Sequence, residues 1–436
     1  MNRFQRFNVS LLILCIFGFL TLISSFPSPR IFNSLLPSTQ LIFSTPSPSS
    51  HKRFRLKHLY EHKPNGEGET FLRRLDVHSA VSFYANNEPP AHAIKIKTGS
   101  VRRPKNRHAF RDVRTTSHFK RILAQTEYTR DEFAVLPDPS DRNTILEIAK
   151  MTFNAYNNHD EPILARNDKW YDLGDRWRLN SSFGWGSDGV RGHVFGDENA
   201  STLFIAIKGT SASFLGGGDT SARDKLNDNL LFSCCCGRVD TTWHPVCDCY
   251  KDSYTCDENC LETSLDNKEL YYAAAMHIFF DVVDKYPDAD IWLTGHSLGG
   301  SLAALLGLTF GLPTITFETP GDKLAAQRLH LPMPPAINGS DVPIWHFGHT
   351  ADPVFMGVCT GPTSSCYYGG YAMESKCHTG KVCVYDVVAD LGWRLDIRSH
   401  RIADVIERVL KKYDKVPTCV EDTECEDCGM WKFPEY

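Results

Sequence analysis

One short stretch of this chain, residues 295–300 (GHSLGG), has the residue types and spacing needed for nucleophilic catalysis. The stretch 291–293 before it is apolar, and the residues after it are mostly small, as at the start of a tightly packed helix. A serine between glycines at the junction of a strand and a helix is typical of a nucleophile elbow, in which a sharp turn lifts the hydroxyl above the sheet. We therefore expect Ser297 to be the nucleophile of a hydrolase rather than an idle hydroxyl in a tight turn.

A serine hydroxyl reacts near neutral pH only with a histidine base, which an acid must orient. In α/β-hydrolases these residues follow the serine in the order acid, then histidine, at the carboxyl ends of strands. Asp352 comes just after the predicted strand 343–347 and is the expected acid, whereas Asp341 precedes that strand. His400 is the expected base, and His378 is its rival in a glycine-flanked loop.

The oxyanion formed during acyl transfer needs two donors that are already in place. The backbone N–H of Leu298, directly after the nucleophile, is the expected first donor. Thr210 follows the predicted strand 202–207 and is expected to provide the second through its N–H and hydroxyl.

The predicted elements alternate between strands and helices, which indicates an α/β-hydrolase with a mostly parallel sheet. We expect strands at 191–195, 202–207, 291–293, 314–317 and 343–347, and helices at 141–156, 266–286 and 401–411. Between them, residues 211–263 are rich in glycine and cysteine and have no clear periodicity. A loop of this length inside a domain is usually functional, so we expect a cysteine-rich lid region there.

The N-terminal part divides by composition. Residues 1–8 are expected to be cytosolic, 9–26 a transmembrane signal anchor, 27–60 a Pro/Ser-rich stem and 61–130 a basic accessory segment. The hydrolase domain is then expected at 131–418, followed by a cysteine-containing tail at 419–436. Cleavage of the apolar stretch as a signal peptide remains an alternative.

The charge pattern leaves one question open. The formal net charge of −5 argues against a nucleic-acid partner. Residues 101–130, however, contain nine Lys and Arg against two acidic residues. This segment is either a solvated basic face or a surface attracted to anionic lipid.

Cysteine usage indicates the compartment. Apart from Cys15, the 15 cysteines all lie between Cys234 and Cys428, an even set of a size expected in an oxidising environment. Three glycosylation sequons agree with a lumenal domain, at Asn180, Asn199 and Asn338.

The fourteen remaining cysteines are expected to be mostly disulfide-bonded. We expect the group 234–260 to cross-link the lid region and the group 359–383 to brace the loop before His400. A zinc site in the first group is the alternative, but its spacing lacks a paired C-x-x-C set. We therefore expect no metal and no cofactor.

With these residues in view, the chain resembles the class 3 (fungal triacylglycerol) lipase family. The resemblance lies in residues 291–300, in 207–210 (IKGT) and in the order Ser297, Asp352, His400. More narrowly, the chain is similar to the vacuolar lipases of fungal autophagy. That similarity is carried by 223–236 (RDKLNDNLLFSCCC), 369–378 (GGYAMESKCH), 396–400 (DIRSH) and 425–431 (CEDCGMW).

The resemblance implies a single-pass type II membrane protein. It would travel through the endoplasmic reticulum, Golgi and multivesicular bodies to the vacuole. There it would hydrolyse phospholipid or acylglycerol in the membranes of autophagic bodies. The resemblance also puts Ser297, Asp352 and His400 on the positions of the catalytic triad, whereas the basic segment before Asp131 has no counterpart. Two other interpretations stay open: a serine acyltransferase or peptidase on the same fold, and a catalytically idle membrane-binding protein.

Overall fold

The computed structural model describes most of the chain from residue 51 onward, and the described residues lie in one unit, Ser49–Tyr436. The described ranges are 51–64, 70–76, 92–113, 115–156, 189–210, 221–238, 244–266, 270–334, 338–361 and 363–434. The expected cytosolic tail at 1–8 and the expected anchor at 9–26 lie outside these ranges. Among the described residues, no helix combines the length and the apolar composition that a membrane crossing requires.

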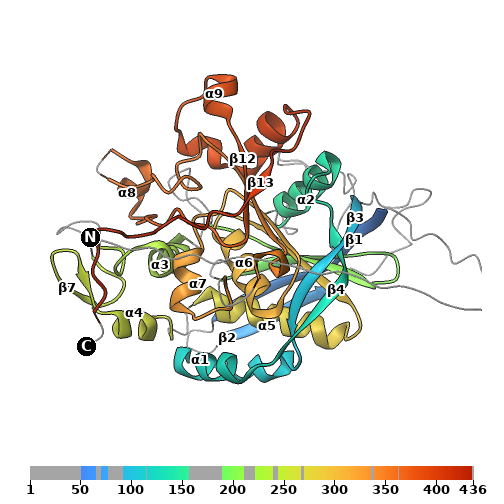
Figure 1. The fold of residues 1–436 in the computed structure, drawn as a ribbon, viewed down its shortest axis with the longest axis horizontal. Helices are drawn as coiled ribbons and strands as arrows, with labels where there is room; N and C mark the ends of the chain where they lie inside the picture. The colour runs from blue at the N-terminus through green and yellow to red at the C-terminus, as the bar shows by residue number, and fades with distance from the viewer. Residues whose placement is uncertain are drawn as a thin grey trace, which may run out of the picture. The chain divides into compact units, whose positions relative to one another are not determined.

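An eleven-stranded sheet forms the centre of the fold (Figure 1). Its order is β13-β12-β11-β10-β9-β6-β5-β1-β3-β4, with β2 paired to β1. The bounds are β1 His51–Pro64, β2 Thr70–Asp76, β3 His92–Pro104, β4 Tyr128–Pro137, β5 Arg191–Gly196, β6 Thr202–Ile207, β9 Asp290–His296, β10 Thr314–Phe317, β11 Ile344–His349, β12 Lys381–Tyr385 and β13 Cys419–Val420. The five predicted strands are confirmed as β5, β6, β9, β10 and β11. Strands β6, β9, β10, β11 and β12 are parallel, and antiparallel strands extend the sheet on both sides.

Helices cover both faces of this sheet. The bounds are η1 Arg107–Phe110, α1 Thr116–Gln125, α2 Arg142–Asn154, α3 Ser221–Phe232, α4 Glu258–Ser264, α5 Tyr271–Lys285, α6 Leu298–Phe310, α7 Lys323–Arg328, η3 Gly339–Asp341, α8 Ser365–Gly369, α9 Val387–Leu391, η4 Ile397–His400, α10 Ile402–Asp404 and the π-helical turn η5 Val405–Leu410. The helices predicted at 141–156 and 266–286 are confirmed as α2 and α5.

Side chains of β9 divide between the two helical layers because successive residues of a strand point to opposite faces. Ile291 and Leu293 belong to the apolar core that includes α5 and α6. Trp292 belongs to the core that includes α2 and η5, and it is fully buried. The nucleophile strand is therefore fixed from both sides.

The expected lid region at 211–263 is largely regular structure where it is described. It contains α3, the hairpin of β7 (Tyr250–Asp252) and β8 (Thr255–Cys256), and α4. The expectation of an irregular loop is wrong because α3 turns polar side chains inward, which hides its helical period. Asp224 accepts a hydrogen bond from the Tyr271 hydroxyl at 2.9 Å, and Asn227 Oδ1 accepts one from the Tyr271 N–H at 2.6 Å.

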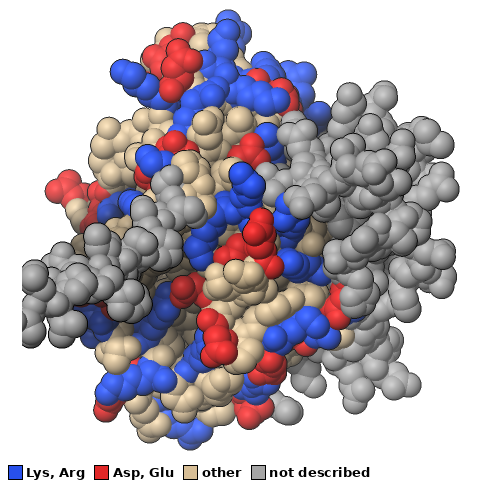
Figure 2. Space-filling model, turned by 90° about the vertical axis from the view of Figure 1, so that its right-hand side faces the viewer, with Lys and Arg blue, Asp and Glu red and all other residues tan. Residues whose placement is uncertain are grey.

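The boundaries expected at 60 and 130 fall inside the sheet. β1 begins within the expected stem, and the expected basic segment contains β3 and α1. Its basic residues also have acidic partners: Arg103 pairs with Asp290, Lys105 with Glu127, Arg111 with Asp284 and Arg130 with Asp341. On the face shown in Figure 2, blue and red side chains are interspersed rather than gathered by sign. These observations favour the solvated-face interpretation.

All fourteen cysteines after Cys15 form disulfides, as expected. The pairs are Cys234–Cys428, Cys235–Cys256, Cys236–Cys247, Cys249–Cys260, Cys359–Cys366, Cys377–Cys425 and Cys383–Cys419. The expected grouping is only partly right, because three bonds lead to the tail 419–428. The tail runs past α3 to β7 (Figure 1), where the Lys432 N–H donates to the Tyr254 carbonyl at 2.7 Å. Three disulfides therefore attach the tail to the rest of the domain.

Candidate active site

The predicted strand, turn and helix around Ser297 are present. Ser297 has φ 56° and ψ −136°, a conformation that residues with a side chain seldom adopt and that is often found at active sites. Glycines make the turn possible by removing side chains where backbones meet. A Cβ on Gly295 would lie 2.6 Å from the Gly300 nitrogen, and a Cβ on Gly299 would lie 2.5 Å from the Lys208 carbonyl carbon.

Ser297, His400 and Asp352 form one line of hydrogen bonds. The Ser297 hydroxyl oxygen lies 3.0 Å from His400 Nε2, and His400 Nδ1 lies 2.7 Å from Asp352 Oδ2. All three residues are buried. Because an ionised carboxylate only accepts hydrogen bonds, Nδ1 carries the proton and Nε2 is free to accept from the serine. His400 closes the short turn η4 rather than opening a regular helix, and the expected helix 401–411 is split into α10 and η5.

Asp352 is strongly held in its ionised form. Burial alone would raise its pKa, but the charge of His400 and the hydrogen bond from it outweigh burial and lower the pKa to about 2. The other oxygen, Oδ1, accepts from the Val354 N–H at 2.9 Å. The carboxylate therefore has a fixed orientation toward the imidazole.

A second histidine positions the first. His296 Nε2 lies 2.7 Å from the backbone carbonyl oxygen of His400, to which it donates. On its other side, His296 Nδ1 lies 2.6 Å from the Tyr156 hydroxyl, which also accepts from the Gly209 N–H at 3.1 Å. Burial, with the charge of His400, lowers the pKa of His296 to about 3, so this ring is neutral. His296 therefore connects three parts of the fold: Tyr156 just after α2, the end of β9 and the turn that carries His400.

The two expected oxyanion donors differ in what the structure shows. Leu298 is the first residue of α6, so its N–H belongs to the first turn, where no intrahelical acceptor exists. The Thr210 hydroxyl donates to Asp228 Oδ2 at 2.8 Å, which fixes the side chain beside the nucleophile. Burial raises the pKa of Asp228 well above its usual range.

The space in front of the nucleophile is small. A cavity of about 20 Å³ lies there, with room for about one water molecule. Its lining is Thr210, Asp228, Ser297, Val354, Cys366, Tyr371, Met373 and His400. A larger cavity of about 380 Å³, lined in part by Arg103 and Phe310, lies near the start of β9, at the end of the strand away from Ser297. The chemistry therefore lies at the smaller cavity.

The rival residues lie elsewhere. His378 Nε2 contacts the Thr319 carbonyl oxygen at 2.9 Å and has no contact with Ser297. Asp341 accepts from the Ser100 hydroxyl at 2.6 Å and from Arg130 Nε at 2.9 Å. Neither joins the line of hydrogen bonds described above.

Sequence reasoning missed the roles of Tyr156, Asp228 and Glu318 in this site. Tyr156 was expected only as the last residue of the predicted helix 141–156, and Asp228 lay in the expected lid region 211–263. Glu318 offered a signal that could have been used, because it directly follows β10 at the same sheet edge as Ser297. Carboxyl ends of parallel strands meet at one edge, so this acid had to lie near the nucleophile.

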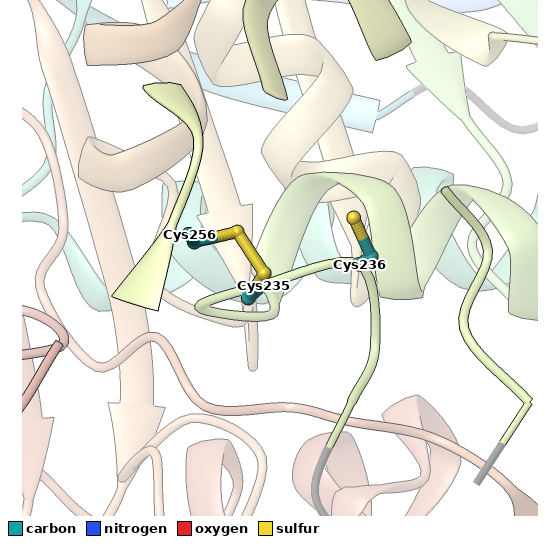
Figure 3. Close-up of side chains that lie close together, drawn as sticks. All are labelled: Cys235, Cys236 and Cys256. Atoms are coloured by element: carbon teal, nitrogen blue, oxygen red, sulfur yellow. A yellow bond between two sulfur atoms is a disulfide. The ribbon is translucent and has the colours of Figure 1, made fainter. Parts of the chain in front are cut away.

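The cysteine clusters do not offer a metal site. The sulfurs of Cys235, Cys236 and Cys256 lie close together, but Cys235 is bonded to Cys256 (Figure 3). Cys236 is bonded to Cys247, and Cys249 to Cys260. A zinc ligand must be a thiolate, and disulfide sulfurs cannot provide one.

Two of the three sequons can be located. Asn199 is exposed in the turn between β5 and β6, and Asn338 is exposed at the start of η3. Asn180 lies outside the described residues. Exposure is a requirement for a glycan, so Asn199 and Asn338 remain predicted glycosylation sites.

This combination of a parallel sheet, an elbow and a Ser–His–Asp arrangement defines an α/β-hydrolase. Residues 238–312 match the model of the family described as "Lipase (class 3)". A relative from Meyerozyma guilliermondii named "Putative lipase ATG15" is 40% identical over 94% of this chain and 82% of its own length. The chain therefore belongs to the ATG15 lipase family.

A second sequence relative agrees with this assignment, and a solved structure shows only a weak likeness. A Vanderwaltozyma polyspora relative with the same name is 53% identical over 69% of this chain, which spans about half (54%) of that relative. The crystal structure of Lip2 lipase from Yarrowia lipolytica is 18% identical and covers 56% of this chain and 78% of its own, with a TM-score of 0.29. That score is too low to support an argument. The family assignment rests on the sequence relatives.

Proposed function

We propose that this protein is a lumenal serine lipase or phospholipase that hydrolyses ester bonds of membrane lipids. The observation that carries the proposal is the buried line from the Ser297 hydroxyl through His400 to Asp352. The named relatives support ester hydrolysis, because they are called lipases.

The reaction would proceed through an acyl-enzyme. Ser297 Oγ attacks the ester carbonyl carbon while its proton passes to His400 Nε2, and Asp352 stabilises the imidazolium that forms. The backbone N–H groups of Leu298 and Thr210 stabilise the oxyanion. As the C–O bond breaks, the alcohol leaves with the proton from His400. Water then attacks the acyl-enzyme with the same base and releases a fatty acid.

The lining of the cavity suits an acyl chain. Val354, Tyr371 and Met373 present apolar surface beside Ser297. Because the cavity holds about one water molecule, lipid can enter only after some of these side chains move. The residues that line this cavity do not distinguish one lipid head group from another. We therefore assign the substrate class broadly, as phospholipid or acylglycerol.

We also propose where the protein acts. Seven disulfides favour an oxidising lumen, and the resemblance to vacuolar lipases of fungal autophagy favours action on autophagic membranes in the vacuole. In this arrangement the stretch 9–26 anchors the protein and residues 1–8 stay cytosolic. Full-length protein in sealed microsomes should then be resistant to added protease and sensitive to glycosidase after detergent; cleavage of the catalytic unit without detergent would contradict this topology.

The test of activity compares two buried serines of the elbow. Purified full-length protein is given liposomes of defined phospholipid or acylglycerol composition, and released fatty acid is measured. Ser297→Ala should lower the rate by at least about 10⁴-fold, because the nucleophile is lost. Ser301→Ala is the matched control: its hydroxyl only donates to the Pro320 carbonyl at 3.2 Å, so most activity should remain.

Each alternative has its own outcome. Fatty acid release by Ser297→Ala would exclude the serine mechanism. Transfer of the acyl group to an added alcohol in preference to water would indicate an acyltransferase, and cleavage of amides only would indicate a peptidase. Liposome binding without any turnover, together with no labelling by a fluorophosphonate, would indicate an idle membrane-binding protein.

A further inference from the structure

Glu318 places a second buried carboxyl group inside the site, and the mechanism above does not use it. It directly follows β10 and is 1% exposed. Its Oε2 accepts a long hydrogen bond of 3.3 Å from the His349 N–H, and its Oε1 is buried without a hydrogen-bond donor among the described residues. A carboxyl oxygen in that position is poorly satisfied as an anion.

The backbone makes this residue more unusual. Glu318 has φ 46°, in the left-handed region where glycine is favoured and other residues carry strain. Glycine would remove that strain at no steric cost. A glutamate at this position indicates that its side chain has a use at the active site, where such strain is commonly found.

Glu318 and Asp352 belong to one buried cluster around His349. The His349 N–H donates to Glu318 Oε2 at 3.3 Å, and the Asp352 N–H donates to the His349 carbonyl at 3.1 Å. Each of the two carboxyl groups also shifts the pKa of the other. Two carboxylates that share a buried site cannot both be ionised, so the pair holds one proton. Asp352 has the better donors, since Oδ2 accepts from His400 and Oδ1 accepts from the Val354 N–H. The proton therefore resides on Glu318.

The titratable groups around this pair come from several elements. His349 lies on β11 and His400 lies on η4, where it contacts Asp352. His296 lies on β9, and its ring is neutral. Among the described residues, these histidines and Asp352 are the ionisable groups that face Glu318 or its partner. None of them is a lysine or arginine, whose permanent positive charge would let Glu318 ionise.

His349 is neutral as well, which its hydrogen bonds explain. Its Nδ1 accepts from the Ala351 N–H at 3.2 Å, so its proton lies on Nε2, which donates to the Ser399 carbonyl at 3.2 Å. Burial lowers the pKa of His349. Its Nε2 lies 3.7 Å from Glu318 Oε1, too far to satisfy that oxygen.

We propose that Glu318 is a protonated positioning residue whose carboxylic acid donates a hydrogen bond to Asp352, so that Asp352 stays ionised and bonded to His400 in acidic surroundings. The proposal rests on the proposed function, because it takes Asp352 as the acid of the triad. It extends the triad by one residue that touches neither substrate nor nucleophile.

The direction of the pKa shifts agrees with this geometry. Burial, together with the charge of Asp352, raises the pKa of Glu318 well above its usual range. The hydrogen bond from Glu318 adds to the effect of His400 in lowering the pKa of Asp352. Asp352 thus stays ionised in acidic surroundings.

The test uses two variants of equal strain and similar size. In Glu318→Gln the side-chain N–H₂ keeps a donor toward Asp352 but cannot ionise, and in Glu318→Met the donor is lost. Without the donor, Asp352 attracts protons more strongly, so the Asp352–His400 pair becomes protonated at a higher pH. We expect the acid limb of kcat/KM in Glu318→Met to move up by about one pH unit, and that of Glu318→Gln to stay near wild type.

The proposal is overturned if the acid limb of Glu318→Met matches wild type, or if Glu318→Gln moves as far. A purely structural role would lower stability in both variants without this difference in pH profile. Infrared difference spectra of wild type against Glu318→Gln provide a readout that needs no Met variant: the carbonyl stretch of a protonated acid should disappear, and its absence from wild type would overturn the proposal. Fluorophosphonate labelling of wild type separates the two failures, since unlabelled Ser297 would refute the proposed function itself.

Discussion

Two regions of this molecule reach fixed geometry by different means. The elbow region (β9, Ser297 and α6) is held by glycine contacts between backbones, apolar burial and hydrogen bonds to His296. The cysteine region (residues 234–260 with 419–434) has strands of only two or three residues and a small apolar cluster, and disulfides cross-link it. Where a segment cannot build a large core, covalent bonds replace it. We therefore expect substitutions of the triad side chains to act on rate, and loss of the disulfides in the cysteine region to act on stability.

The largest effects should come from the triad. His400→Ala should lower kcat by about 10⁶-fold and Asp352→Asn by about 10⁴-fold, because the base and its orientation are lost. Either change combined with Ser297→Ala should add little, since the three residues act as a unit. Steady-state ester hydrolysis measures these rates, and the disulfide map should be unchanged.

The control for this pair is His378→Gln. It alters a buried histidine that contacts the Thr319 carbonyl, away from Ser297, and Gln can still donate there. A severe loss of kcat in His378→Gln with a mild loss in His400→Ala would show that the base is wrongly assigned.

The next effect belongs to the cysteine region. Replacing Cys234 and Cys428 with alanine opens a loop of 194 residues and should lower the free energy of unfolding by about 5 kcal/mol. Replacing Cys249 and Cys260 opens a loop of 11 residues and should lower it by about 3 kcal/mol. Denaturant unfolding measures both, and kcat of the folded enzyme should stay within about two-fold. A variant that kept its stability but lost kcat would break the division between the two regions.

Two glycines compare the regions directly. A Cβ at Gly295 would meet backbone atoms of Gly299 and Gly300, the latter at 2.6 Å, and backbone cannot move aside. Gly295→Ala should therefore lower the free energy of unfolding by about 3 kcal/mol. At Gly429 the nearest atom would lie 4.0 Å away, so Gly429→Ala should change it by less than about 0.5 kcal/mol. Thermal unfolding of both variants measures this difference. A larger loss of stability in Gly429→Ala than in Gly295→Ala would contradict the prediction.

The smallest effect is a pH dependence. Glu374 Oε2 accepts from the Cys234 N–H at 2.7 Å, and burial raises the pKa of Glu374 from 4.5 to about 7. A folded-state pKa above the unfolded value means that the folded state binds the proton more tightly. The contribution to stability is therefore complete below about pH 4.5 and is lost as the pH rises through about 7.

Glu374→Gln should remove this dependence while keeping an acceptor for Cys234. The difference in free energy of unfolding between wild type and Glu374→Gln should change by about 2 kcal/mol between pH 4.5 and 7, favouring wild type at the acidic end. Parallel stability curves for the two proteins would show that Glu374 is not protonated in the folded state.

The two regions also differ in how far sequence alone predicts them. The elbow is local: strand, turn and helix follow one another, so Ser297 and Gly295 reveal its geometry directly. Asp352 and His400 follow from chain order and strand ends. Tyr156 could not be placed, because it meets His296 across 140 residues of sequence, and only packing brings them together.

The cysteine region resists prediction for a combinatorial reason. Fourteen cysteines allow on the order of 10⁵ complete pairings, and spacing does not select among them. The bonds of the tail to Cys234, Cys377 and Cys383 depend on the path of the folded chain. α3 was missed for a related reason, since Asp224 and Asn227 are buried by partners far along the sequence.

The pairing of three successive cysteines has a consequence for biosynthesis. Cys236 and Cys235 bond to partners 11 and 21 residues later, but the partner of Cys234 follows 194 residues later. At about 5–20 residues per second, the ribosome needs about 10–40 s to supply it. Throughout that interval Cys234 lacks its native partner, whereas the partners of Cys235 and Cys236 are already present. Any wrong bond that Cys234 forms must be exchanged before Cys428 can bond to it. The Cys234–Cys428 bond can therefore form only after Ser297, Asp352 and His400 have all been synthesised.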